Sequence, residues 1–420
     1  MEGLKIKRNI LCFDLKSFFA ACECLERGLD LYNCPLVVAD PRRGGGGITL
    51  AITPYLKNLG VKSRGRIYEI PKNIDYIIAK PRMNLYIKKS KEVVDVYLNY
   101  VSSDDLHIYS IDEVFIDITN YLNLYNLTDY ELSLKILKDI KDKTGLTATC
   151  GIGPNIFLAK VAMDIEAKHN KDNIAKWDYE DIETKLWTIS PLSKVWGIGK
   201  QTEKKLNLLG IKTIGDLANY NKFSLKKKFG VLGEELWYRA NGIDITKISD
   251  LKLDPQDKSF SHSQVLFKDY YEHNIDLIID EMCDVIASRL RKEKMLTSLL
   301  SFGIEYSKSL GGGFHHSQKL GHPTDKSAYL KEICSLMFNK YYNGDPIRKV
   351  SLGVGRLSEK DSYQLNIFEE NSELEKIEST HQAVDEIRAK YGKNSLIKAS
   401  HLLDDSTIKE RNEKVGGHNA

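Results

Sequence analysis

The stretch YSIDEVFIDI, residues 109–118, carries three carboxylates inside an otherwise strand-like sequence. Consecutive side chains on a regular strand point to opposite faces of the sheet. Asp112 and Glu113 can therefore share a face only if the chain turns or bulges between them. The apolar runs on either side, 106–111 and 114–119, predict the two strands of a hairpin with both acids at its tip.

A third carboxylate ends another apolar run. Residues 9–15 read as a buried strand that includes Asp14, within LCFDLKSFFA, and residues 17–27 read as the helix that follows. If this strand is a neighbour of the hairpin, Asp14 converges with Asp112 and Glu113. Such a cluster is costly unless cations neutralise it, and hard oxygen ligands favour Mg²⁺ or Mn²⁺ over zinc. The alternative is that these acids only cap turns or face solvent.

Length and composition indicate a globular protein with several domains. A chain of 420 residues with 42% hydrophobic and 28% charged residues predicts about two to four domains. No apolar run approaches the roughly 18–20 residues of a membrane span. Seven cysteines without a C-x-x-C pair predict reduced thiols in a cytoplasmic protein. Residues 191–240 hold ten Lys/Arg against four Asp/Glu, which favours a polyanionic partner, although a solvated helical face gives the same pattern.

The order of expected elements indicates an α+β fold in several parts. Further strands are expected at 36–39, 48–52, 75–79 and 147–152, and further helices at 84–100, 130–143 and 155–167. From residue 190 the sequence changes to short, Lys-rich helical pieces, and a polar linker with Pro255 follows. Residues 259–357 then read strand, helix, strand, strand, helix, strand, which predicts a βαββαβ sandwich.

Three motifs occur in order along the first half of the chain. They are CFDLKSFFAACE at 12–23, YSIDEVFIDI at 109–118 and CGIGPNIFLAKVAMDIEAKHN at 150–170. In this order and spacing they resemble the motifs of the Y-family, or translesion, DNA polymerases, in the UmuC-like (ImpB, MucB, SamB) branch. The resemblance, which extends from residue 8 to 357, implies error-prone, template-directed synthesis on damaged DNA by two-metal nucleotidyl transfer, in the setting of the SOS response.

The resemblance also implies a right-hand architecture. Residues 1–189 are expected to form palm and fingers, 190–250 a helix-hairpin-helix thumb, 257–357 a βαββαβ little finger and 358–420 a C-terminal tail with one helix at 376–390. The end of the first little-finger helix carries basic side chains that are expected to face either phosphates or solvent: Arg289, Arg291, Lys292 and Lys294.

By the same resemblance, Asp14, Asp112 and Glu113 are the catalytic carboxylates. Together with the Leu15 carbonyl they are implied to hold two Mg²⁺ ions, or Mn²⁺. Ser110 fits the same motif and is expected to hydrogen-bond near the primer end.

Four residues are implied to bind the nucleotide: Phe19, Lys57, Lys168 and Tyr55. Phe19 matches an aromatic steric gate, which rejects a ribonucleotide because its 2′-hydroxyl would clash with the ring; alternatively, Phe18 and Phe19 both belong to the core. Lys57 and Lys168 are implied to contact the triphosphate. Pro54 occupies the place of the family's tyrosine, with Tyr55 one residue further on.

The segment VWGIGKQTEKKLNLLGIKTIGDLA, residues 195–218, is typical of a helix-hairpin-helix. Backbone N–H groups at such a turn suit a phosphate, and neighbouring lysines add charge that is independent of base sequence. The expected DNA contacts are Gly197, Gly199, Lys200, Lys204 and Lys205. A plain helical hairpin is the alternative.

The segment QLNIF, residues 364–368, lies between polar stretches. Gln364, Leu365, Ile367 and Phe368 resemble the short peptide by which bacterial polymerases bind the sliding clamp, with an amide for orientation and apolar anchors for a pocket. The alternative is a last core strand. The other partners implied are primer-template DNA, a dNTP and a recombinase filament or other SOS factors.

Two other functions remain compatible with the residues alone. A nucleotide cyclase can share a palm-like sheet with paired metal carboxylates, but it has no use for a helix-hairpin-helix. A catalytically inactive DNA- or clamp-binding protein is disfavoured because all three carboxylates are present.

Overall fold

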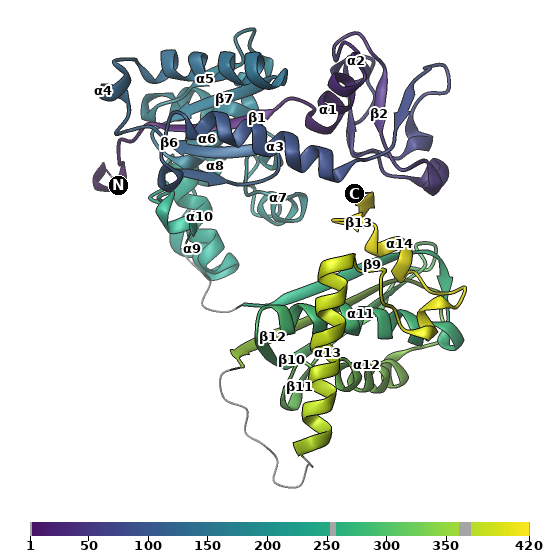
Figure 1. The fold of residues 1–420 in the computed structure, drawn as a ribbon. Helices are drawn as coiled ribbons and strands as arrows, with labels where there is room; N and C mark the ends of the chain where they lie inside the picture. The colour runs from purple at the N-terminus through teal and green to yellow at the C-terminus, as the bar shows by residue number, and fades with distance from the viewer. Residues whose placement is uncertain (1, 253–257, 361–370, 420) are drawn as a thin grey trace. The chain divides into compact units, whose positions relative to one another are not determined.

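The computed structural model describes residues 2–252, 258–360 and 371–419. The chain divides into two compact units: unit 1 contains residues 1–253 with 418–420, and unit 2 contains residues 254–417 (Figure 1). In the described part of the chain, no helix is both long enough and apolar enough to cross a membrane.

A five-stranded sheet with the order β5-β6-β1-β7-β8 forms the centre of unit 1. Its strands are β1 (Ile10–Leu15), β5 (Leu106–Ile108), β6 (Glu113–Asp117), β7 (Ala148–Gly153) and β8 (Ile174–Lys176). Helices α1 (Phe18–Glu26), α3 (Met83–Leu98) and α5 (Asp129–Thr144) pack on one face, and α6 (Ile156–Ile165) packs on the other (Figure 1). The strands and helices expected in this region are confirmed, and β8 is an additional strand.

β1 is apolar along its length because helices cover both faces of its sheet. Leu11 and Phe13 belong to the core beneath α1, α3 and α5, whereas Ile10 and Cys12 belong to the core beneath α6. This alternation puts Asp14, the next residue of the second series, on the α6 face.

A second, small sheet with the order β3-β2-β4 forms the predicted fingers. It contains β2 (Leu36–Val38), β3 (Ala51–Ile52) and β4 (Ile77–Ala79), with the short helix α2 (Pro54–Asn58) beside it. Its own core is small and is formed by Val37, Ala39, Ile52, Leu56, Val61 and Ile70.

Four short helices follow in the region expected to be the thumb: α7 (Lys200–Asn207), α8 (Ile214–Asn219), α9 (Lys222–Phe229) and α10 (Val231–Ala240). They share one hydrophobic core with α6, so they pack directly on the palm. Asn155 Nδ2 donates to the Gly242 carbonyl at 2.8 Å and Trp187 Nε1 donates to the Ala240 carbonyl at 2.9 Å, which fixes this packing. The remaining helix of unit 1 is α4 (Leu122–Tyr125).

Unit 2 confirms the predicted βαββαβ order. It contains β9 (Phe260–Tyr270), α11 (Glu272–Lys292), β10 (Met295–Tyr306), β11 (Gly313–Thr324), α12 (Ser327–Tyr341) and β12 (Ile347–Glu359). The strands form an antiparallel sheet with the order β11-β10-β12-β9, and α11 and α12 cover one face of it. Most side chains of β11 are exposed.

The C-terminal segment packs on the βαββαβ part of unit 2 as far as residue 417, and residues 418–420 belong to unit 1. Helix α13 (Asn371–Tyr391) runs along α11, and α14 (Ile408–Asn412) and the two-residue strands β13 (Lys414–Val415) and β14 (His418–Asn419) follow. The expected helix at 376–390 is thus confirmed. Arg291 does not face phosphate or solvent: its Nε donates to Asp385 Oδ2 of α13 at 2.6 Å. Residues 364–368 lie outside the described residues.

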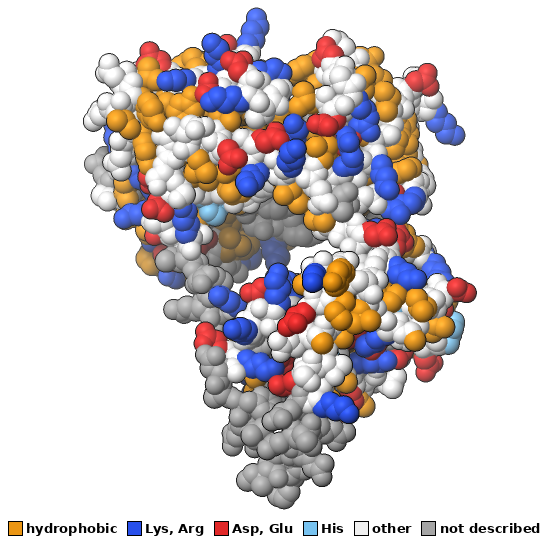
Figure 2. All heavy atoms as spheres, viewed as in Figure 1, with side chains coloured by type: hydrophobic (Ala, Val, Ile, Leu, Met, Phe, Trp, Pro, Cys, Tyr) orange, Lys and Arg blue, Asp and Glu red, His pale blue; other side chains and the backbone are white. Residues whose placement is uncertain are grey.

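Charges of both signs are interspersed on the face of unit 1 that Figure 2 shows. The net charge of +3 therefore does not produce a surface of one sign on that face.

Candidate active site and nucleic-acid interface

The pairing of β1 with β6 brings the predicted carboxylates together. Asp14 lies directly opposite Glu113 in this antiparallel pair, and side chains of directly opposed residues lie on the same face. The Leu15 N–H donates to the Asp112 carbonyl at 2.9 Å. Asp112 itself lies in the bend between β5 and β6, as predicted, so the strand alternation is interrupted before Glu113.

Two glycines of the third motif let α6 approach the sheet closely. A Cβ on Gly151 would overlap the backbone of Ala159 and Met163, and a Cβ on Gly153 would lie 2.5 Å from the Ala159 nitrogen. Gly151 is the partner of Cys12 on β1, two pairs away from Asp14 and on the same face of the sheet. The glycines therefore allow α6 to place its side chains directly against the carboxylates.

Lys160 of α6 is the nearest cation to Glu113. Its Nζ lies 2.8 Å from Glu113 Oε1 and 3.1 Å from Asp164 Oδ2, and the side chains of Lys160 and Glu113 are 8% and 9% exposed. Burial acts to lower the pKa of Lys160, but Cys12, Asp164 and Glu113 outweigh it and the pKa lies above its ordinary value. Lys160 is therefore a buried, charged counter-ion of Glu113.

Lys168 connects the same network to Asp14. Its Nζ lies 2.7 Å from Asp164 Oδ1 and 3.4 Å from Asp14 Oδ2. The motif-based assignment includes Lys168 but omits Lys160 and Asp164. Their signal in the sequence is the four-residue spacing of Lys160 and Asp164, which puts both on one side of α6, with Lys168 four positions further on in the short turn after it.

Burial makes the ionised form of Asp14 and of Glu113 less favourable. It raises the pKa of Asp14, and Asp112 adds to this effect while Lys168 opposes it. It also raises the pKa of Glu113, against the opposing effect of Lys160. The nearby lysines compensate the negative charge of these hard oxygen ligands only in part, which fits a divalent cation of the Mg²⁺ or Mn²⁺ type.

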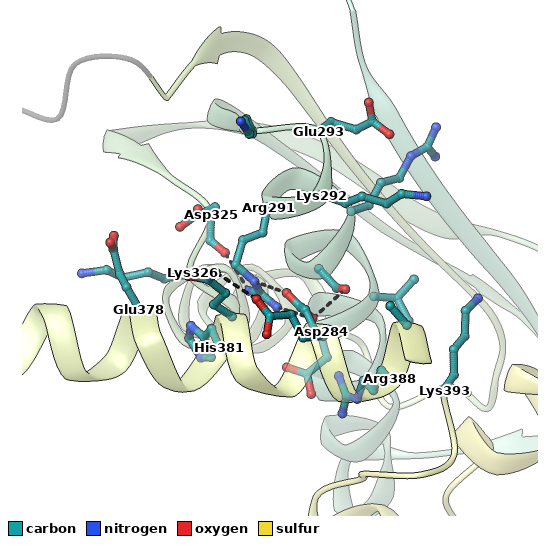
Figure 3. A pocket seen from close by; sticks show the side chains of 18 of the residues that line it. Asp284, Arg291, Lys292, Glu293, Asp325, Lys326, Glu378, His381, Arg388 and Lys393 are labelled. Carbon is teal, nitrogen blue, oxygen red and sulfur yellow. Dashed lines mark hydrogen bonds and ion pairs between the residues drawn. The ribbon is translucent and has the colours of Figure 1, made fainter. Parts of the chain in front are cut away.

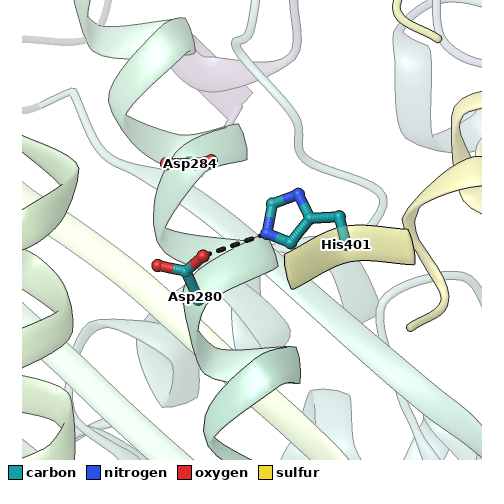
Figure 4. A group of neighbouring side chains, drawn as sticks. All are labelled: Asp280, Asp284 and His401. Carbon is teal, nitrogen blue, oxygen red and sulfur yellow. Dashed lines mark hydrogen bonds and ion pairs between the residues drawn. The ribbon is translucent and has the colours of Figure 1, made fainter. Parts of the chain in front are cut away.

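The three carboxylates are not the tightest ligand group of the described residues. That group is Asp280, Asp284 and His401 in unit 2, whose ligand atoms lie within 4.8 Å of one another (Figure 4). There, Lys398 Nζ lies 3.1 Å from Asp280 Oδ2 and 2.9 Å from Asp284 Oδ1, and so compensates part of the charge of the two acids. The group links the C-terminal segment to α11.

Phe19 and Phe18 have different surroundings, as the steric-gate interpretation requires. Phe18 is 3% exposed and belongs to the core, whereas Phe19 is only partly buried. The ring of Phe19 stacks on Tyr86 with centroids 4.5 Å apart and an angle of 16° between the planes.

Tyr86 is fixed in turn by a buried acid. Its hydroxyl donates to Glu23 Oε1 at 2.8 Å, and Arg82 Nε donates to the same oxygen at 3.0 Å. Burial acts to raise the pKa of Glu23, but the hydrogen bonds from Arg82, Arg27 and Tyr86 outweigh it and hold the pKa below its ordinary value. The buried Glu23 carboxylate therefore holds Tyr86 in place, and Tyr86 packs against Phe19.

The other predicted site residues lie on the surrounding segments. Lys57, in the last turn of α2, donates to Ser17 Oγ at 2.8 Å, at the start of α1. Ser110 Oγ donates to Asp112 Oδ1 at 2.7 Å, so it orients that carboxylate. Tyr55 is 37% exposed on α2.

The helix-hairpin-helix turn has the expected backbone. Gly197 has a φ of +91°, which favours glycine, whereas Gly199 has an ordinary φ of −80° and caps α7. Lys200, Lys204 and Lys205 are exposed along α7, and no ion pair involves them within the described residues. The turn is joined to the carboxylate hairpin, because Trp196 Nε1 donates to the Tyr109 hydroxyl at 3.1 Å.

Comparison with known proteins identifies the family. The impB/mucB/samB family matches residues 13–164, its C-terminal domain matches 257–367, and the IMS family HHH motif matches 179–211. The chain belongs to this family of Y-family DNA polymerases and is a DNA-directed DNA polymerase, which acts on DNA and dNTPs.

Full-length relatives and a solved structure agree with this assignment. The chain is 37% identical to the Bacillus subtilis protein named for UV-damage repair, UvrX, over 98% of both chains, and 32% identical to DNA polymerase IV 2 of the same species over 98% of this chain and 99% of that one. The fold is similar to that of the Y-family DNA polymerase chimera Dbh-Dpo4(243-245)-Dbh, with a TM-score of 0.66, 21% identity, and coverage of 84% of this chain and 99% of the chimera.

Proposed function

We propose that this polymerase extends primers on damaged templates by two-metal nucleotidyl transfer, with Asp14, Asp112 and Glu113 as its catalytic carboxylates. The observation that carries the proposal is the β1–β6 register, which sets Asp14 opposite Glu113 directly after the bend at Asp112. The raised pKa values of Asp14 and Glu113 support a role for these acids in binding positive charge.

The three carboxylates and the Leu15 carbonyl are the proposed ligands of two Mg²⁺ or Mn²⁺ ions. When bound, such ions activate the primer 3′-hydroxyl and stabilise the charge that develops on the α-phosphate and the leaving pyrophosphate. The chain contributes preorganisation, since the ligands come from two adjacent strands and Lys160 fixes one oxygen of Glu113 at 2.8 Å.

Lys168 and Lys57 are the proposed contacts of the triphosphate. Lys168 lies 3.4 Å from Asp14 Oδ2 and keeps a second partner in Asp164, so it is held at the site before the nucleotide arrives. Lys57, which reaches Ser17 at the start of α1 from the last turn of α2, is a second flexible point charge. Compact ammonium groups suit a pyrophosphate that must leave.

Phe19 is the proposed steric gate. Its stack on Tyr86 restrains the ring, so it cannot yield to a ribose 2′-hydroxyl at low cost. Tyr55, partly exposed on α2, is the proposed aromatic neighbour of the triphosphate.

The turn at Gly197 and Gly199 and the lysines of α7 are proposed to bind the phosphates of the duplex. The absence of ion pairs to Lys200, Lys204 and Lys205 within the described residues supports this, because these charges remain available to phosphate. Contacts of this kind do not depend on base sequence and tolerate a damaged base.

Damaged DNA is proposed as the substrate class on two grounds. A relative that covers the whole chain is named for UV-damage repair. In addition, the predicted fingers have strands of only two or three residues around a small core. So small a domain over the nascent base pair would place few restraints on an altered base.

The sliding clamp is a proposed partner through Gln364, Leu365, Ile367 and Phe368, which lie outside the described residues. A weak tether of this kind raises the local concentration of primer ends without new contacts at the active site.

The direct experiment is primer extension opposite an abasic site and a UV photoproduct, with and without Mg²⁺. We expect Mg²⁺-dependent incorporation opposite both lesions. Efficient extension on undamaged DNA that stops at both lesions would leave a polymerase but refute the translesion proposal.

A further inference from the structure

A large cavity lies in unit 2, between α11, α13 and the segment after α13. Its volume is about 1030 Å³, and the ion pair between Arg291 and Asp385 crosses it (Figure 3). Eight Lys or Arg residues and six Asp or Glu residues line it, so the lining is cationic. None of these residues belongs to the catalytic site.

Cations and acids line the cavity toward both ends. Toward one end Lys360 forms ion pairs with Asp325 at 2.9 Å and Glu378 at 3.3 Å. Lys292, Arg388 and Lys393 lie toward the opposite end in Figure 3. Within the described part of the chain, no ion pair joins these three residues, or the neighbouring Arg289, to an acid; Arg289 instead lies over the Phe260 ring at 4.2 Å.

His262 and Arg411 show that positive side chains lie close together near Lys393 and Arg289. Arg411 of α14 donates a hydrogen bond to the ring of His262 on β9. Burial, followed by the charges of Arg411, Lys393 and Arg289, lowers the pKa of His262 to about 4. Burial lowers the pKa of Arg411 to about 10, although the nearby Glu281 carboxylate acts to raise it. Several cations thus converge around a half-buried neutral histidine, an arrangement that an anion would stabilise.

The acids that line the same cavity have other partners. Asp284 is held by Lys398 at 2.9 Å, and Glu386 Oε1 accepts a hydrogen bond from Gln382 at 2.9 Å. Glu293 is the C-terminal cap residue of α11. None of these acids forms an ion pair with Arg289 or Lys393 in the described chain.

The backbone that carries the cations is held in place. Arg388 Nε donates to the Leu396 carbonyl at 2.8 Å. Asn394 Nδ2 donates to the Lys409 carbonyl at 3.0 Å, and Asn412 Nδ2 donates to Asn394 Oδ1 at 2.8 Å. The charges of the C-terminal segment are therefore positioned before any ligand binds.

We propose that Arg289, Lys292, Arg388 and Lys393, with Arg411 nearby, form a second anion site, which binds a small polyphosphate of the class of pyrophosphate, tripolyphosphate or a nucleoside triphosphate. Guanidinium groups contact phosphate through paired N–H donors, and the lysines add point charge. The cavity is of the size that ligand sites have. It is a concave space between helices, which suits a compact anion better than an extended DNA strand.

The site lies on the helix side of the unit 2 sheet. His262 is the β-sheet partner of Leu352, a core residue beneath the helices, and opposed side chains share a face. A bound anion would join α11 to the segment that follows α13, and it would stabilise unit 2.

The test is calorimetric titration of the full chain with sodium tripolyphosphate in the presence of EDTA, which removes divalent cations from the catalytic site. We expect one saturable site per chain. The double variant Arg289→Ala, Lys393→Ala should bind at least tenfold more weakly, and Lys393→Arg should bind as the wild type does. Lys138→Ala with Lys308→Ala, which removes two exposed charges elsewhere, should also leave binding unchanged.

Thermal melting should show that tripolyphosphate stabilises the wild-type protein but not the double variant. If the double variant fails to fold, the exposed single variant Lys393→Ala takes its place and should bind several-fold more weakly. Equal affinity in wild type and variant, or no binding to the wild type, overturns the proposal. A parallel titration with single-stranded oligonucleotide tests whether the same cations bind a DNA strand instead. If the double variant loses oligonucleotide binding but still binds tripolyphosphate as the wild type does, the small-anion proposal is wrong.

Discussion

At the scale of single residues, Asp14 is a carboxylate whose surroundings make its ionised form unfavourable. Burial raises its pKa, and Lys168 compensates only in part from 3.4 Å. Because the folded-state pKa lies above the unfolded value, the ionised group lowers stability at neutral pH, and this penalty declines as the pH falls toward the raised pKa. Such a residue is retained for function rather than for stability.

This argument predicts the behaviour of Asp14→Asn. Without divalent cations, its thermal midpoint at pH 7.5 should equal or exceed that of the wild-type protein, because a buried charge is removed. Mg²⁺ or Mn²⁺ should raise the midpoint of the wild type and leave that of the variant unchanged. Calorimetric melts with EDTA and with each metal measure both effects, and a variant that melts well below the wild type in EDTA would contradict the argument.

Phe19 and Phe18 differ in burial although they are adjacent, so they provide a matched pair. Phe19→Ala should raise incorporation of ribonucleotides relative to deoxyribonucleotides by at least about tenfold, because the clash with the 2′-hydroxyl disappears. Phe18→Leu, a change in the core, should alter stability and not sugar selection. Single-nucleotide incorporation with rNTP and dNTP measures the ratio, and an unchanged ratio in Phe19→Ala means that the gate is another residue.

The sequence predicted the carboxylates but not their counter-ions. Asp112 and Glu113 can be recognised because two adjacent acids contradict the alternation of a strand. Lys160 and Asp164 lie within a helix whose pattern is also satisfied by solvent-exposed charge. Their burial depends on the close approach of α6 to β7 at Gly151, which is a tertiary contact and has no local signal.

At the scale of elements, the helix-hairpin-helix turn depends on one of its two glycines. A side chain at Gly197 would have an unfavourable positive φ and a Cβ 3.1 Å from Arg239 Nη1, whereas Gly199 has open space around it. Gly197→Ala should therefore cost about 1 kcal/mol or more of stability and weaken DNA binding, whereas Gly199→Ala should be nearly neutral in stability. Urea unfolding and fluorescence anisotropy with a primer-template measure the two effects; equal effects would contradict the assigned turn.

The lysines of α7 should act through charge alone. Replacing Lys200, Lys204 and Lys205 with alanine should weaken duplex binding about equally for all sequences and reduce the slope of log K against log salt by up to about three. Anisotropy titrations between low and moderate salt measure this slope. An unchanged slope would assign the lysines to solvent.

Element order proved more predictable than the docking of elements. The βαββαβ order of unit 2 follows from local hydrophobic periods, and its helices and strands lie where expected. The packing of α13 on α11 does not follow from local periods, because it depends on the contact of Arg291 with Asp385, 94 positions away in the sequence. The expected exposure of Arg291 was wrong for this reason.

At the scale of the whole molecule, the proposed clamp-binding peptide, residues 364–368, should affect processivity and not chemistry. Leu365→Ala with Phe368→Ala should leave distributive synthesis intact and remove stimulation by the clamp, because both apolar anchors are lost. Asn366→Ala, which changes the residue between the anchors, should retain stimulation. Primer extension with and without a loaded clamp measures this, and full stimulation of the double variant would exclude the tether.

The central claim is that Asp14, Asp112 and Glu113 perform the chemistry of the whole enzyme. The most direct test is Mg²⁺-dependent single-nucleotide incorporation by Asp112→Ala and Glu113→Ala, with Asp117→Asn, on the same strand as Glu113, as the control. We predict loss of incorporation in both alanine variants with primer-template affinity nearly unchanged, and near wild-type activity in the control, since metal charge stabilisation contributes several kcal/mol to the transition state. An alanine variant that retains more than about a tenth of the wild-type rate, a loss below about 1.4 kcal/mol, would contradict the proposed site.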